Sequence, residues 1–150
     1  LIAIRAVGSI AAGLVASRFV KTGAASLSPV VAGLAVALSV GLVPAYNNAV
    51  VIGVLMIVVG FGAGVMTLYF QITMSDYTGM AERGSALALG GLGWGFSHLT
   101  TPLAMGYLAD HVGLVPGFYV LGAFAICWTI YLAFIRTWAF PTPKPAGSPH

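Results

Sequence analysis

The stretch that decides the fold runs from Ala49 to Ile72 and reads AVVIGVLMIVVGFGAGVMTLYFQI. It contains no charged side chain over its whole length. A helix of about 20 apolar residues, rising about 1.5 Å per residue, crosses the roughly 30 Å hydrocarbon core of a bilayer. The run is too long for a strand and lacks the alternation of a barrel strand. It therefore predicts a membrane-spanning helix.

Four more apolar segments accompany this one, at roughly Leu1–Ser17, Ala24–Pro44, Ser85–Leu108 and Gly117–Ile135. Short linkers join them, and the longest and most polar is Thr73–Gly84, whereas Ala109–Pro116 precedes the last segment. We expect an all-α fold, a polytopic transmembrane bundle of about five membrane-spanning helices. The bundle should cover residues 1–137, and the Pro-rich residues 138–150 should form a disordered cytosolic tail.

The N-terminal segment is slightly short and begins without Met, a basic region or a cleavage site. It is therefore not a signal peptide. We expect it to be a truncated helix, and the chain to be part of a longer protein.

Composition excludes several classes of protein. The chain is 59% hydrophobic and 6% charged, whereas soluble domains carry about 25% charged residues. So few charges cannot cover a soluble domain, and the bilayer is the expected partner of the outer surface. The six Lys and Arg residues are spread along the chain and form no basic patch, which argues against nucleic acid. Cys127 is the single cysteine, and no Cys/His metal spacing exists, so we expect no metal and no cofactor.

The basic residues between and after the segments predict the orientation. Arg18 and Lys21 lie in the first linker, Arg83 lies in the third, and Arg136 and Lys144 lie at or after the end of the last segment. The second and fourth linkers contain no Lys or Arg. By the positive-inside rule, the first and third linkers and the C-terminus face the cytosol. We expect a multi-pass protein of the bacterial inner (plasma) membrane.

Two G-x-x-x-G pairs lie inside the apolar segments, Gly60 with Gly64 and Gly91 with Gly95. Glycines at this spacing let helix backbones approach closely. Two interpretations of the pairs remain open at this point: tight packing alone, or bending of the helices during a transport cycle.

Three stretches carry a family resemblance: Gly13–Lys21 (GLVASRFVK), Glu82–Leu89 (ERGSALAL) and Pro102–Gly113 (PLAMGYLADHVG). The first is similar to the G-x-x-x-D-R-x-G-R linker motif of the major facilitator superfamily, although Ser17 replaces its acid and Val20 its second glycine. The other two resemble the R-G-x-A-x-x-L and P-x-x-x-G-x-L-A-D-x-x-G stretches around the eleventh helix of many such transporters.

The resemblance implies helices eight to twelve of a C-terminal six-helix half, with the N-terminal half of the same protein as its missing partner. Such transporters move a small-molecule substrate by rocking of two halves around a central site. The implied protein is a secondary active transporter and not an enzyme, with no catalytic residue expected.

Arg5 is the most informative polar residue. It lies twelve positions before Ser17, about 18 Å along the helix at about 1.5 Å per residue, which is near mid-membrane. A guanidinium at that depth must face protein or water. We consider two roles: contact with an anionic substrate or a partner acid, and a structural ion pair or hydrogen bond to carbonyls.

A polar row on the fourth segment is the second candidate for the substrate or ion pathway. Trp94, His98 and Thr101 recur at helical spacing, with His98 near the centre of the segment. Such a row should face the bundle interior. Histidine as a residue type titrates near neutral pH, so His98 is either a proton carrier or a hydrogen-bonded packing residue.

The remaining candidates lie at the ends of the segments. Asn48 opens the third segment, either as a pathway residue or as a helix cap. On the opposite side, we expect Arg18 to pair with Glu82 or Asp76, next to Arg83, when a cytosolic gate closes. The alternative is a solvated polar linker, in which an ion pair contributes under about 1 kcal/mol.

Several functions stay open for the whole protein. Uptake of a small solute, with a slight preference for an anionic one, competes with proton-driven efflux of drugs or metabolites; proton coupling itself is undecided. A non-transporting membrane subunit is less well supported. An integral-membrane enzyme would need a cluster of catalytic side chains, and no acid lies within any segment.

Overall fold

The computed structural model describes residues 2–15, 27–79 and 81–139. These residues form five α-helices and one short 3-10 helix: α1 (Ile2–Val15), α2 (Ser28–Leu42), η2 (Val43–Ala45), α3 (Ala49–Tyr77), α4 (Arg83–Val112) and α5 (Leu114–Ala139). No strand occurs in this part of the chain. The all-α prediction is confirmed.

Two linkers are shorter than the sequence predicted. Helix α3 continues through Tyr77, so the polar linker Thr73–Gly84 shrinks to residues 78–82. The linker predicted at Ala109–Pro116 is wrong, because α4 and α5 are separated by Gly113 alone. Gly113 has φ +95°, a backbone conformation that other residues rarely adopt. Hydrophobicity marks only the apolar part of a helix, and these helices continue beyond that part.

Three helical stretches are long and apolar enough to cross a membrane: Ser28–Ala45, Ala49–Asp76 and Leu114–Ile135. The apolar helix Ala3–Val15 is shorter. Helix α4 has 30 residues, which at about 1.5 Å each exceeds the hydrocarbon thickness. It is not among the three because glycine and polar residues replace much of its apolar surface. The protein is an integral membrane helix bundle in which α4 is the least apolar long helix.

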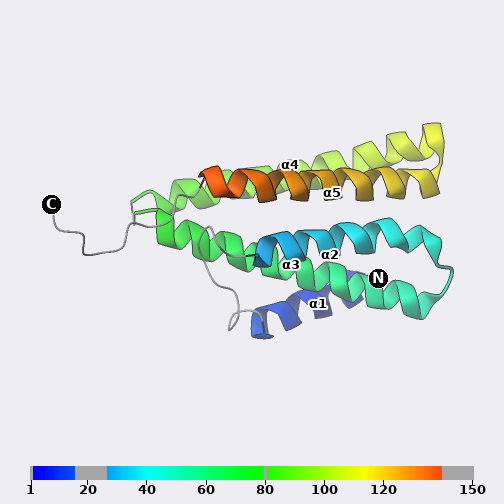
Figure 1. The fold of residues 1–150 in the computed structure, drawn as a ribbon, viewed down its shortest axis with the longest axis horizontal. Helices are drawn as coiled ribbons and strands as arrows, with labels where there is room; N and C mark the ends of the chain where they lie inside the picture. Colours follow the sequence, from blue (N-terminus) through cyan, green and yellow to red (C-terminus); the bar gives the residue numbers. More distant parts are fainter. Residues whose placement is uncertain (1, 16–26, 80, 140–150) are drawn as a thin grey trace.

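The helices pack in a chain of neighbours. Helix α1 packs on α3, α3 on α2, α2 on α5, and α5 on α4, with a smaller contact between α3 and α4 (Figure 1). Helices α2 to α5 alternate in direction, so that the 78–82 linker and the end of α5 lie at one end of the bundle (Figure 1). Asn48 and Gly113 lie in the turns at the opposite end.

The closest contact in the bundle joins α1 to α3 through small residues. A Cβ added at Gly60 would collide with the backbone carbonyl of Arg5, and one added at Gly64 would lie 2.6 Å from the Cβ of Ala12. The Ser9 hydroxyl also donates a hydrogen bond to the carbonyl oxygen of Gly60, at 3.0 Å. The tight-packing interpretation is confirmed for the Gly60–Gly64 pair.

Candidate functional site

The polar row of α4 lies near the middle of that helix. Trp94, His98 and Thr101 are all exposed, and no residue of α4 is buried. Helix α4 is covered mainly by α5 and only slightly by α3. Most of its surface, including the polar row, therefore has no neighbour among the described residues.

His98 is oriented by the turn that precedes it. Its Nδ1 lies 3.3 Å from the carbonyl oxygen of Trp94, and the two rings meet edge to face with centroids 5.3 Å apart. When Nδ1 carries the proton, it donates to that carbonyl. This tautomer leaves Nε2 as a hydrogen-bond acceptor or proton acceptor for a ligand.

Pro102 changes the backbone at the same place. It lies inside α4, four residues after His98. Because proline has no N–H, the carbonyl of His98 lacks the usual helix donor from position 102. His98 thus carries both an imidazole and a carbonyl that lacks its helix hydrogen bond, and proline favours a kink in the helix at this place. The four-residue spacing of His98 and Pro102 is visible in the sequence. It implies a missing helix hydrogen bond only if the helix continues through both residues.

Arg5 lies at the level of the middle of α3. Its carbonyl oxygen faces Gly60, about 17 Å along α3 from Ala49 at about 1.5 Å per residue. Its side chain is exposed. The three acids of the chain are Asp76, Glu82 and Asp110, which all lie in the last turns of helices or in the 78–82 linker. The described helices therefore provide no acid at the depth of the Arg5 guanidinium.

The structure does not bring the two mid-membrane candidates together. Arg5 is on α1, which packs on α3, whereas His98 is on α4, which packs on α5. Figure 1 shows α1 and α4 on opposite sides of the bundle, with α2 and α3 between them. A site using both residues needs atoms from outside the described helices.

Asn48 caps α3 at one end of the bundle. Its side-chain oxygen accepts hydrogen bonds from the backbone N–H groups of Val50, at 2.9 Å, and Val51, at 3.4 Å. These bonds satisfy donors that a helix N-terminus leaves unpaired. The cap interpretation is confirmed, while a role of Asn48 in the pathway stays a prediction.

At the opposite end, Arg83 ties the start of α4 to the end of α3. Its guanidinium donates to the carbonyl oxygens of Ser75, at 2.7 Å, and Thr78, at 3.4 Å. A cation at a helix C-terminus is stabilised by the helix dipole and by the unpaired carbonyls. The Arg83 side chain thus links the start of α4 to the last turn of α3 and to Thr78.

The other members of the expected gate are placed only in part. Asp76, in the last turn of α3, and Glu82, the last residue before α4, are both exposed. Glu82 occupies the N-cap position of α4 but makes no side-chain capping bond. Arg18, the expected partner of both acids, lies outside the described residues.

The described residues hold no group of three or more His, Cys, Asp or Glu side chains that could bind a metal. At mid-depth they present a single imidazole and a single guanidinium, and their acids lie near the ends of the helices. Such a set can bind a polar solute or carry a proton.

The model of the Major Facilitator Superfamily matches residues 1–150, the whole chain. No curated protein and no solved structure matches it.

Proposed function

We propose, from the premise that this chain belongs to the Major Facilitator Superfamily, that it forms part of a secondary active transporter. The protein is a membrane transporter by family. In the proposed mechanism it moves a small solute by alternating access, and a second helical half of the same protein completes the pathway.

The observation that carries this proposal is the polar, uncovered face of α4. Every residue of that helix keeps some exposure, although the helix is long enough to cross a membrane. Polar groups at that depth are costly against lipid and face protein or water in transporters. The row of Trp94, His98 and Thr101 is therefore assigned to the wall of the pathway, where glycines and Pro102 permit bending.

Arg5 is assigned to recognition of an anionic solute. A guanidinium forms paired hydrogen bonds with carboxylate or phosphate, and no acid of the described helices lies at its level. In an uptake assay with a panel of labelled solutes, Arg5→Ala should abolish transport of the anionic substrate, and Arg5→Lys should retain part of it. Unchanged transport and expression in Arg5→Ala would remove this role.

His98 is assigned to proton coupling, because an imidazole can accept and release a proton and its Nε2 is not used by the helix. We expect His98→Gln to flatten the pH dependence of uptake and to lower its response to an imposed proton gradient. His111→Gln is the matched control: His111 makes the same contact with the carbonyl four residues earlier, at 2.9 Å, but lies in the last turn of α4. A normal pH profile in His98→Gln would refute the assignment.

Proton-driven efflux of drugs or metabolites is the competing function for the same site. It uses His98 in the same way but needs no anion receptor. Loading vesicles with each solute and imposing the proton gradient in either direction separates the two. Export that survives Arg5→Ala favours efflux, and Arg5-dependent uptake favours an anionic substrate.

The end of the bundle that holds Arg83 is assigned to the cytosol of a bacterial inner membrane, with the C-terminus on the same side. There, Arg18 pairs with Asp76 or Glu82 when the cytosolic gate closes. In a Cys127→Ala background, a membrane-impermeant maleimide should label Asn47→Cys in intact cells and Gly79→Cys only after permeabilisation. Labelling of both in intact cells would overturn the orientation.

A further inference from the structure

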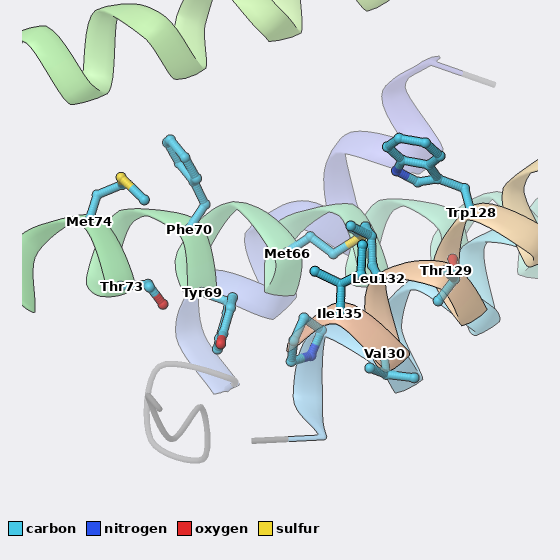
Figure 2. Close-up of a pocket in the computed structure, with 11 residues that line it drawn as sticks. Val30, Met66, Tyr69, Phe70, Thr73, Met74, Trp128, Thr129, Leu132 and Ile135 are labelled. Atoms are coloured by element: carbon cyan, nitrogen blue, oxygen red, sulfur yellow. The ribbon is translucent and has the colours of Figure 1, made fainter. Parts of the chain in front are cut away.

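A cavity of about 450 Å³ lies between α2, α3 and α5, away from the polar row of α4. Its wall is formed by eleven residues, of which Val30, Met66, Thr73, Trp128 and Leu132 matter for the argument (Figure 2). The volume falls within the roughly 300–1,000 Å³ typical of small-molecule sites.

One polar group in this wall has no partner. Thr73 is 3% exposed, and its Oγ1 makes no hydrogen bond. By contrast, Thr67 and Thr129 each donate to the carbonyl four residues earlier, at 2.9 and 2.8 Å. A buried hydroxyl without a partner is costly, and such exceptions call for an explanation.

The lining residues are spread along the helices, and the unpartnered Thr73 hydroxyl lies near one end of the group. Thr73 lies four residues before the end of α3, near the 78–82 linker. Met66 lies two turns deeper on α3, and Trp128 lies eleven residues before the end of α5. Figure 2 shows Thr73 and Trp128 at opposite ends of the group of lining side chains. The apolar part of the wall therefore extends from a polar end near the membrane boundary towards the bilayer centre.

We propose that this cavity binds a single-chain amphiphile, an alkyl chain with a hydrogen-bonding head group. The head group bonds to the Thr73 hydroxyl after that side chain rotates about χ1 to face the cavity, and the chain lies along Met66 and Leu132 towards Trp128. The occupant enters from the bilayer, as a lipid chain or as a free amphiphile that has partitioned there. This site is independent of the proposed transport function.

Binding can be measured by quenching of Trp128 with a bromine at the far end of the chain. The complete transporter, with phenylalanine at every tryptophan except Trp128 (Trp94→Phe and Trp138→Phe in this chain), is placed in nanodiscs and titrated with 11-bromo-1-undecanol. We expect saturable quenching. Thr73→Val, which removes a hydroxyl that bonds nothing in the protein, should weaken binding of the alcohol about two- to tenfold. It should leave binding of 1-bromoundecane, which has no head group, unchanged.

A matched pair of fillings tests the location. Val30→Phe places a larger side chain in the cavity wall and should weaken binding of both probes. Val31→Phe, at a neighbouring position that is 62% exposed and outside the wall, should leave binding of both probes unchanged.

The proposal is wrong if quenching rises linearly with probe concentration and is the same in Val30→Phe and Val31→Phe. It is also wrong if no quenching occurs, because protein then fills the space. If Thr73→Val weakens binding of both probes equally, or leaves binding of both unchanged, the contact between the head group and Thr73 is wrong. A fluorinated amphiphile observed by NMR in the same nanodiscs supplies a second readout if Trp128 is quenched by its neighbours.

Discussion

The two G-x-x-x-G pairs have the same spacing and opposite surroundings. Gly60 and Gly64 of α3 lie against α1, where an added Cβ would meet a backbone carbonyl or another Cβ. Gly91 and Gly95 of α4 have nothing within 4 Å of an added Cβ. The G-x-x-x-G spacing thus leaves part of one helix face without side chains, but it does not determine whether a neighbouring helix packs there.

The neighbours of each helix explain the difference. Helix α3 is covered by α1 on one side and by α2 on another, whereas α4 is covered mainly by α5. Close backbone approach on α3 also brings the Ser9 hydroxyl to the Gly60 carbonyl. Gly60 and Gly64 are packing residues of α3, whereas Gly91 and Gly95 leave a face of α4 that is open to bending or to another surface.

The strongest test of the comparison is Gly60→Ala. The new methyl group would collide with the carbonyl of Arg5, and backbone cannot move as a side chain can. We expect a loss of about 1–3 kcal/mol or more, as for other overpacked cores. Gly53→Ala on the same helix has no atom within 4 Å and is the control. The midpoint of thermal unfolding of the transporter in detergent measures both, and equal midpoints would contradict the packing.

The second test is Gly91→Ala, for which we expect the opposite sign. With no clash, alanine should favour the helix by up to about 1 kcal/mol. The unfolding midpoint should stay the same or rise. If α4 bends during transport, the same variant should lower the rate of uptake. A large loss of stability would instead show that another surface packs on this face.

The smallest expected effect belongs to Ser9→Ala, which separates hydrogen bonding from shape in the α1–α3 contact. Hydrogen bonds between membrane helices contribute about 0.6 kcal/mol on average, so the unfolding midpoint should fall only slightly. Ser97→Ala is the control because its hydroxyl bonds to a carbonyl of its own helix, that of Trp94, at 3.1 Å. A loss as large as that of Gly60→Ala would assign the contact to the hydrogen bond.

Local features of the site were predictable, and those that need two helices were not. The cap at Asn48 depends on residues within one turn, so side-chain chemistry was enough to predict it. The contacts of Arg83 with carbonyls of α3 depend on how far α3 continues, which hydrophobicity did not show. The Thr73 cavity needs three helices at once, and no spacing along the chain indicates it.

The sequence by itself determined that the chain forms apolar helices of a membrane protein. It also predicted that the basic residues of the linkers lie on one side of the membrane. Backbone hydrogen bonding and burial in hydrocarbon act on each helix separately, so composition and length suffice. Only the tertiary structure decided which glycine face is packed, that Arg5 and His98 lie on opposite sides of the bundle, and that a cavity surrounds Thr73. In lipid, helices associate through shape and a few polar contacts, which depend on pairs of surfaces and not on either sequence alone.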